Sequence, residues 1–231
     1  MSKSKLEILA YDSSPLGPLC LRRRELLSQP GVIVTEVTLN HQFLMSSLYT
    51  DSEKALATIA VEMHNCNELQ VLVGGLGLGY TTRAALNSEK VSHVEVVEFL
   101  PQVIQWMKDG LVPLSSELNQ HQQLEVVQGD VYKRLLNGPD KRYDAILIDV
   151  DHSPDERLDH ESVSFYSEEG LLAAKEHLNK DGVLAVWSYA ESSPFAEALN
   201  RVFAEVRIEP VTYHNQLVDE HPTDWLFFAR D

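Results

Sequence analysis

Three carboxylates, Glu98, Asp130 and Asp149, stand at the ends of three short apolar segments of the chain. Such segments are typical of buried parallel strands, whose carboxyl ends meet at one edge of a sheet, where ligands of open α/β folds bind. A carboxylate at this edge can accept hydrogen bonds from ribose hydroxyls or from the exocyclic amine of adenine. It can also position a cationic amine and take its proton. The pattern therefore predicts a crevice shared by a nucleoside and a nucleophile, although Asp130 is also a candidate helix N-cap.

A glycine-rich segment precedes these carboxylates and reads Val71-Leu72-Val73-Gly74-Gly75-Leu76-Gly77-Leu78-Gly79. It predicts a strand, a tight turn and a helix start, because glycine adopts positive φ angles and lets a ligand approach the backbone. Glu98 follows Gly79 by 19 residues, about where a nucleotide-binding βαβ unit places a carboxylate for ribose hydroxyls. The spacing of Gly75, Gly77 and Gly79 departs from the G-x-G-x-x-G of nicotinamide-dependent oxidoreductases, so that class is the least favoured.

The loop after Asp149 reads Val150-Asp151-His152-Ser153-Pro154 and contains further ionisable groups. Asp151 and His152 are therefore candidate substrate-binding residues, and an acidic surface loop is the alternative. The same oxygen and nitrogen atoms suit a divalent cation. However, spacings of one and two residues in a loop fix no coordination geometry, so we expect no metal site.

The elements that must position these residues alternate between strand and helix from about residue 69 onward, which predicts a mostly parallel sheet with helices on both faces. The last two predicted strands are separated by a loop alone, which indicates a C-terminal antiparallel hairpin. The predicted strands are Leu69–Gly74, Val94–Glu98, Leu124–Gln128, Tyr143–Ile148, Val183–Trp187, Val206–Val211 and Trp225–Ala229. The predicted helices include Thr81–Asn87, Val131–Leu136, Gly170–Leu178 and Pro194–Phe203, and Asp181-Gly182 is predicted to form a turn.

The first part of the chain has a different pattern. Short β-like segments separated by proline and glycine predict a small β appendage over residues 1–50, followed by a nucleoside-binding catalytic domain over residues 51–231. Ser52 is a candidate cap for a helix that runs to Met63.

Composition narrows the function classes. The 231 residues are 44% hydrophobic and carry a formal net charge of −16, which disfavours nucleic-acid binding and suits a cationic substrate or simply solubility. No apolar run is long enough to cross a bilayer, and no leader segment is visible. With only two cysteines, we expect a cytoplasmic protein that contacts neither membranes nor nucleic acid.

The glycine segment, Glu98, Gly129-Asp130 and the Tyr143–Asp149 segment together resemble the spermidine synthase family of polyamine aminopropyltransferases. The resemblance implies an α/β fold like that of class I S-adenosylmethionine-dependent methyltransferases: a Rossmann-like, mostly parallel seven-stranded sheet with a C-terminal antiparallel hairpin and a small N-terminal β appendage. It also implies a homodimer and, as cofactor, decarboxylated S-adenosylmethionine or S-adenosylmethionine itself.

The resemblance implies roles for individual residues as well. Gly75, Gly77 and Gly79 would lie under the methionine-derived part of the cofactor, Glu98 would bind the ribose, and Asp130 with Val131 would bind the adenine end. Asp149 would orient and deprotonate the attacking amine. Gln42, Tyr49, Asp151 and His152 would bind the polyamine-type substrate.

The chain departs from the family pattern at three places, and these keep other functions open. The family's glycine segment has an aspartate where Leu78 stands here. The family's Asp-Ser-Ser-Asp-Pro loop is Asp149-Val150-Asp151-His152-Ser153 here, and Tyr49 and Glu53 are the nearest matches to its Tyr-x-Glu-Met box. The loop is also similar to the Asp-x-Asp-His segment of some O-methyltransferases. We therefore expect aminopropyl transfer to an amine, with a methyltransferase, metal-dependent or not, and a catalytically silent nucleoside-binding relative as alternatives.

Overall fold

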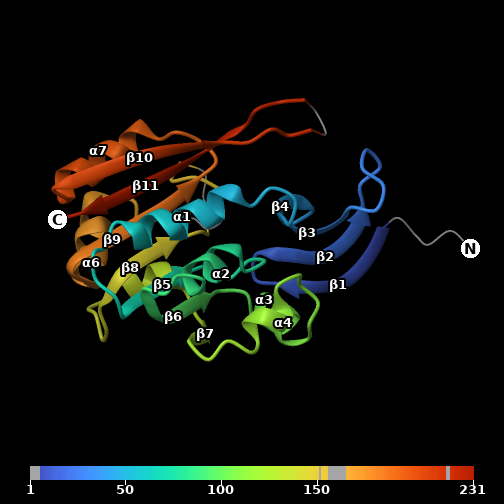
Figure 1. Cartoon of the computed structure of the whole chain (residues 1–231), viewed down its shortest axis with the longest axis horizontal. Coiled ribbons are helices and arrows are strands. Elements are labelled where there is room, and N and C mark those ends of the chain that lie inside the picture. Colours follow the sequence, from blue (N-terminus) through green and yellow to red (C-terminus); the bar gives the residue numbers. More distant parts are fainter. Residues whose placement is uncertain (1–5, 151, 156–164, 217–218) are drawn as a thin grey trace, which may run out of the picture.

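The computed structural model describes residues 6–150, 152–155, 165–216 and 219–231, which form two sheets with helices packed around the larger one (Figure 1). The larger sheet has seven strands in the order β10-β11-β9-β8-β5-β6-β7. Its strands are β5 (Leu69–Gly74), β6 (Val91–Glu98), β7 (Leu124–Gln128), β8 (Tyr143–Ile148), β9 (Leu178–Ser188), β10 (Glu205–Thr212) and β11 (Thr223–Arg230). Strands β5 to β9 pair in parallel, whereas β11 pairs antiparallel with both β9 and β10. The predicted fold class, including the C-terminal hairpin, is therefore confirmed.

The helices lie on both faces of this sheet (Figure 1). They are α1 (Asp51–Glu62), α2 (Tyr80–Leu86), α3 (Pro101–Lys108), α4 (Ser115–Leu118), α5 (Val131–Leu135), α6 (Glu168–Glu176) and α7 (Ser193–Val202). Alternate residues of each central strand face opposite sides, so Val71 and Val73 pack in the core with α1, α2 and α3, whereas Leu72 packs in a second core with α5, α6 and α7. Burial on both faces explains the continuous apolar segments in the sequence.

The strand order reverses between β5 and β8. Chain connections leave β5 towards β6 and β7 on one side, while β8 and β9 lie on the other side. In open α/β sheets, the crevice outside the carboxyl ends at such a switch point is the usual ligand site. The glycine turn after β5 and Asp149 after β8 stand on its two sides.

The N-terminal segment forms a separate antiparallel sheet in the order β1-β2-β3-β4. Its strands are β1 (Leu6–Ser14), β2 (Gly17–Glu25), β3 (Ile33–Leu39) and β4 (Gln42–Ser46). Leu19, Leu21 and Val37 share the apolar core of the α1 face, and Trp106 of α3 donates a hydrogen bond of 3.1 Å to Asp12 of β1. This sheet is thereby fixed beside the larger one.

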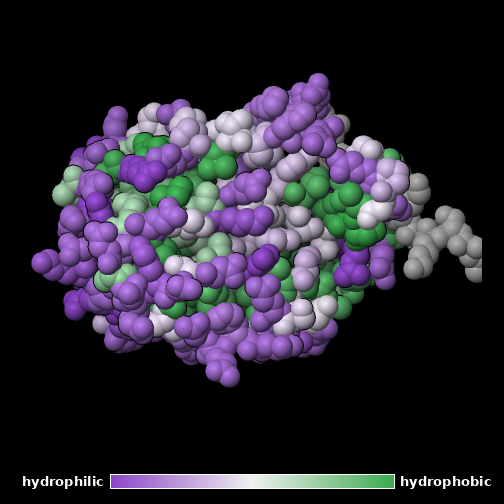
Figure 2. Space-filling view, in the orientation of Figure 1, coloured by the Kyte–Doolittle hydropathy of each residue, from purple (hydrophilic) through white to green (hydrophobic). Residues whose placement is uncertain are grey.

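Exposed apolar side chains gather on the N-terminal sheet. Figure 2 shows an apolar area at that end of the molecule, on a face that is otherwise largely hydrophilic. The large apolar residues exposed on this sheet are Leu6, Ile8, Tyr11, Ile33 and Phe43. No helix within the described residues is both long and apolar enough to cross a membrane.

Three local predictions differ from the structure. Thr50 occupies the N-cap position of α1 without a side-chain capping bond, and Ser52 is buried inside the first turn, where it bonds other side chains instead of capping. Strand β4 was missing from the predicted appendage. Asp181-Gly182 does not precede the strand but lies inside β9, at an irregularity where the pairing with β8 passes from Leu178 to Val183 and Asp181 has a φ angle of 62°.

Candidate functional site

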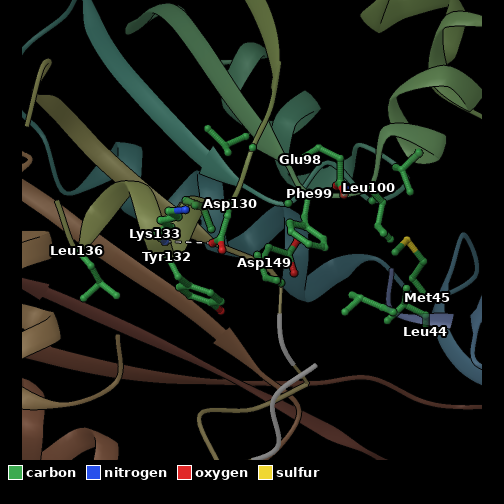
Figure 3. A pocket seen from close by; sticks show the side chains of 18 of the residues that line it. Leu44, Met45, Glu98, Phe99, Leu100, Asp130, Tyr132, Lys133, Leu136 and Asp149 are labelled. Atoms are coloured by element: carbon green, nitrogen blue, oxygen red, sulfur yellow. Dashed lines mark hydrogen bonds between the residues drawn. The ribbon is translucent and has the colours of Figure 1, made fainter. Parts of the chain in front are cut away.

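Two cavities lie side by side at the carboxyl ends of the central strands. The larger, about 420 Å³, is named here the Asp130 cavity and is shown in Figure 3. Its walls come from the glycine turn, the ends of β6, β7 and β8, helices α3 and α5, and the N-terminal sheet. The residues that line it include Leu16, Leu44, Met45, Gly75, Gly77, Glu98, Phe99, Leu100, Val103, Asp130, Val131, Tyr132, Lys133, Leu136, Asn137, Asp149 and Val150.

Glu98 holds the backbone around the Asp130 cavity. Its Oε2 accepts a hydrogen bond of 2.8 Å from the N–H of Leu76, and its Oε1 accepts one of 2.7 Å from the N–H of Leu100. Burial raises the pKa of Glu98, although these backbone N–H groups act in the opposite direction. The carboxylate thus ties the glycine turn to the start of α3 on the wall of the cavity.

Asp130 has two oxygens in different roles. Oδ1 accepts a hydrogen bond of 3.0 Å from the N–H of Lys133 and so caps α5, drawn as the dashed line in Figure 3. Oδ2 makes no hydrogen bond within the described part of the chain, and Asp130 lines the cavity. The capping reading from the sequence is therefore confirmed, and one carboxylate oxygen remains for a ligand. Val131, the next residue, also lines the cavity.

The glycines of the turn are required by close packing. Gly75 has a φ of 92°, and a Cβ there would lie 2.3 Å from the carbonyl oxygen of Asp149. Gly79 has a φ of 93°, caps α2, and would place a Cβ 2.5 Å from Cδ1 of Leu118. Gly77 lines both the Asp130 cavity and the smaller cavity beside it, whereas Gly79 lines only the smaller one. The turn therefore brings bare backbone to the ends of β5 and β8.

The second cavity, about 350 Å³, is named here the Glu53 cavity. Aromatic side chains from several elements and the carboxylates of Glu53, Asp149 and Asp224 surround it. The aromatic residues that line it are Phe43, Tyr49, Tyr80, Trp187, Tyr189 and Tyr213, together with His152. Aromatic faces beside carboxylates favour cations, through both ring quadrupoles and charge.

The carboxylates of the Glu53 cavity resist ionisation. Burial, and next the charge of Asp149, raise the pKa of Glu53 to about 8. Burial also raises the pKa of Asp149 to about 6, against the opposing effect of a hydrogen bond of 2.6 Å from Thr81 Oγ1. The pKa of Asp224 is raised by burial, and a hydrogen bond from Ser52 opposes this. A cation in the cavity would stabilise the ionised forms of all three.

Asp149 stands where the two cavities meet. The residues that line both are Leu44, Met45, Gly77, Asp149 and Val150. Figure 3 shows Asp149 between Asp130 on one side and Leu44 and Met45 on the other. A molecule in the Asp130 cavity and a molecule in the Glu53 cavity would therefore meet beside this carboxylate.

The structure brings most of the residues predicted from the sequence to these cavities. Tyr49 lines the Glu53 cavity, stacks on Tyr213 at 4.9 Å between ring centroids, and accepts a hydrogen bond from the N–H of Gln216. His152 lines the same cavity. Gln42 does not reach the site: it is exposed at the start of β4 and lines neither cavity. Asp151 lies outside the described residues.

Several site residues were missed in the sequence. Ser52, Thr81 and Asp224 carried no motif, because their role depends on partners far away along the chain. Phe99 could have been found, since it directly follows Glu98 and lines the Asp130 cavity. Within the described segments, no group of three or more His, Cys, Asp or Glu residues is arranged to hold a metal ion.

Comparisons with known proteins agree with this geometry. The family model of the spermine/spermidine synthase domain matches residues 25–215. Among solved structures, a spermidine synthase in complex with the transition state analogue AdoDATO is 18% identical, with a TM-score of 0.74 over 96% of this chain and 73% of that chain. The spermidine synthase of Thermotoga maritima is 17% identical, with a TM-score of 0.72 over 96% of this chain and 71% of that one. No curated protein gives a significant match.

Proposed function

This chain belongs to the spermine/spermidine synthase family and is a transferase of the aminopropyl-transferring type, and from this premise we propose which cavity takes which substrate. The Asp130 cavity takes decarboxylated S-adenosylmethionine, and the Glu53 cavity takes a polyamine-type amine. The single observation that carries the proposal is that both cavities open onto Asp149.

The proposed reaction is a direct displacement at carbon. The amine nitrogen forms a bond to the propyl carbon that is attached to sulfur. The bond from that carbon to sulfur breaks, and 5′-methylthioadenosine leaves with the electron pair. The attacking ammonium must first lose a proton, and we assign its removal to Asp149, which lines the Glu53 cavity. Since a sulfonium is already a good leaving group, alignment of the two substrates supplies most of the acceleration.

Electrostatics favour the decarboxylated donor over S-adenosylmethionine itself. The methionine-derived end of the donor would lie beside Asp149, near Glu53 and Asp224. A donor carboxylate there would meet the negative charge of Asp149 in a poorly hydrated cavity, whereas a donor that carries only an amino group would be attracted. The volume of about 420 Å³ falls within the range of small-molecule sites.

Direct assay tests this proposal. The purified chain should transfer an aminopropyl group from the decarboxylated donor to 1,4-diaminobutane, and it should bind S-adenosylmethionine more weakly than the decarboxylated donor. Asp149→Asn should lower turnover by about 100-fold or more, while its affinity for 5′-methylthioadenosine changes by less than about tenfold. Methyl transfer from the carboxylated compound would contradict the proposal, and retained turnover in the variant would remove Asp149 from its role.

We also propose that the chain forms a homodimer through the N-terminal sheet. The exposed apolar residues there, including Ile8 (62%) and Phe43 (58%), support this, since a contiguous apolar area commonly marks an interaction surface. Light scattering should give the mass of two chains for the native protein and of one chain for Ile8→Asp. A native monomer at micromolar concentration would contradict it.

A further inference from the structure

Ser52 is the centre of a buried hydrogen-bond network on the wall of the Glu53 cavity. It is 3% exposed, and its Oγ lies 2.6 Å from Asp224 Oδ2, 3.0 Å from Trp187 Nε1 and 3.1 Å from Glu53 Oε2. The three partners come from β11, β9 and α1. Asp149 lines the same cavity but is hydrogen-bonded by Thr81, so its carboxylate, which takes the proton of the nucleophile in the proposed reaction, is not a member of this network.

The hydrogens in this network can be assigned by counting. A serine hydroxyl has one hydrogen and two acceptor positions. The indole N–H of Trp187, which can only donate, uses one acceptor position and leaves one hydrogen and one acceptor position for the two carboxyl groups. Both carboxyl contacts are then satisfied only if one of the two groups, Glu53 or Asp224, carries a proton and donates it to Ser52 Oγ.

The surroundings of Glu53 favour this residue as the group that carries the proton. Burial and the charge of Asp149 raise its pKa to about 8, against the opposing effect of the contact with Ser52. The other titratable or charged groups around it are Asp224 of β11, Tyr80 and Arg83 of α2, Tyr49, Tyr213 after β10, His152, and the neighbouring Asp51 and Lys54 of α1. Lys54 and Arg83 do not pair with Glu53: Lys54 lies over the Tyr80 ring and near Asp51, and Arg83 pairs with Glu117.

We propose that Glu53 is a specificity-determining residue of the acceptor site that is neutral in the empty cavity and ionises when a cationic amine enters. The Glu53 carboxyl group releases its proton to solvent, and the new carboxylate pairs with an ammonium group of the acceptor. Binding of the amine is thereby coupled to release of one proton. Neutral or anionic molecules of similar size gain nothing from this exchange, so the cavity selects cations. This inference rests on the proposed function only in taking the Glu53 cavity as the acceptor site.

The coupling makes acceptor affinity depend on pH in a predictable way. A proton competes with the amine for Glu53, so the affinity should rise with pH until the Glu53 pKa of about 8 and then level off. Between pH 6 and pH 8 the dissociation constant should fall by about 50-fold for one competing proton. The amine itself stays cationic over this range, since amine pKa values are near 10.

Calorimetric titration with 1,4-diaminobutane at pH 7, in buffers of different ionisation enthalpy, counts the released protons without any need for turnover. The native protein should release about one proton per amine. Glu53→Gln should release almost none and should vary less than about threefold in affinity between pH 6 and pH 8. Glu62→Gln, an exposed residue of the same helix, should behave as the native protein.

Further measurements separate the possible sources of the proton. Asp149→Asn should still release a proton, with the midpoint moved to lower pH, because the charge of Asp149 is the second cause of the raised Glu53 pKa. Release that persists in Glu53→Gln but disappears in Asp149→Asn would overturn the proposal. So would failure of the native protein to bind the amine at pH 8.5. Retained affinity of Glu53→Gln for 5′-methylthioadenosine would show that the variant is folded. Absence of aminopropyl transfer by the native protein, with proton-coupled binding intact, would instead refute the proposed function alone.

Discussion

Thr81 Oγ1 donates a hydrogen bond of 2.6 Å to Asp149 Oδ2 and so joins the first turn of α2 to the end of β8. Thr81 is 3% exposed, so this bond lies in a poorly hydrated environment where it has a strong effect. Burial raises the pKa of Asp149 to about 6, and the bond from Thr81 acts in the opposite direction. The helix that the glycine turn starts therefore sets the proton affinity of the carboxylate at the meeting point of the cavities.

Replacement of Thr81 by valine should raise the pKa of Asp149 further. Valine keeps the shape of threonine but loses the hydroxyl donor, and the ionised carboxylate is then less stable. The acidic limb of the plot of kcat/KM against pH should move upward by about one pH unit. Rates measured from pH 5 to pH 9 on the purified variant check this.

Thr82→Val is a matched control for that change. Thr82 is the next residue, is 1% exposed, and its Oγ1 has no hydrogen-bond partner in the described structure. Removal of an unpaired buried hydroxyl should leave the pH profile unchanged and leave stability equal or higher. Equal shifts in both variants would contradict the role assigned to the Thr81 bond.

Gly75→Ala should destabilise the fold by about 3 kcal/mol. The cost has two sources: the φ of 92° is unfavourable for alanine, and the new Cβ would lie 2.3 Å from the carbonyl oxygen of Asp149, so β5 and β8 must separate. Gly110→Ala isolates the first source, because its φ is 77° and no atom lies within 4 Å of the new Cβ. It should cost only about 1 kcal/mol. Urea unfolding measures both, and equal losses would show that the contact with Asp149 is unimportant.

Asp130→Ser should separate the capping role of Asp130 from its proposed contact with adenine. Serine retains a side-chain oxygen for the N–H of Lys133, so the free energy of unfolding should change by less than about 0.5 kcal/mol. Its short side chain cannot also reach a ligand, so affinity for 5′-methylthioadenosine should fall by about tenfold or more. Asp130→Ala should lose affinity and also about 1 kcal/mol of stability. Unchanged affinity in Asp130→Ser would remove Asp130 from the site.

The sequence predicted the central strands well because their burial leaves a direct pattern. Leu69–Gly74, Leu124–Gln128 and Tyr143–Ile148 agree residue for residue with β5, β7 and β8. Strand β4 was missed because it is half-exposed and its pairing with β3 is irregular between Val37 and Thr38, so it shows no clear alternation. Asp181-Gly182 was expected to form a turn before the strand because both residues favour turns, but β9 already begins at Leu178 and these two residues lie at an irregularity of its pairing with β8.

The site residues could be predicted only where an ionisable side chain stands at the end of a strand. Glu98 is the last residue of β6, Asp130 follows β7 by two positions, and Asp149 directly follows β8; all three line the Asp130 cavity. Asp224 could not be predicted in this way, because its partner Ser52 lies 172 positions away. The packing of α1 against β11 brings them together, and this packing depends on the whole fold.

Glu53 should make the amine-free protein less stable as pH rises. Its pKa is about 8 in the fold and 4.5 without it, so the folded state binds more protons in this interval and stability is lost from pH 4.5 towards pH 8. Glu53→Gln cannot ionise, so its stability relative to the native protein should increase with pH, by at most about 1.4 kcal/mol per pH unit. Urea unfolding at pH 5.5, 7 and 8.5 measures this, with Glu62→Gln as the control. A difference that stays constant across these pH values would mean that Glu53 is already ionised in the empty cavity, and the hydrogen assignment around Ser52 would then be wrong.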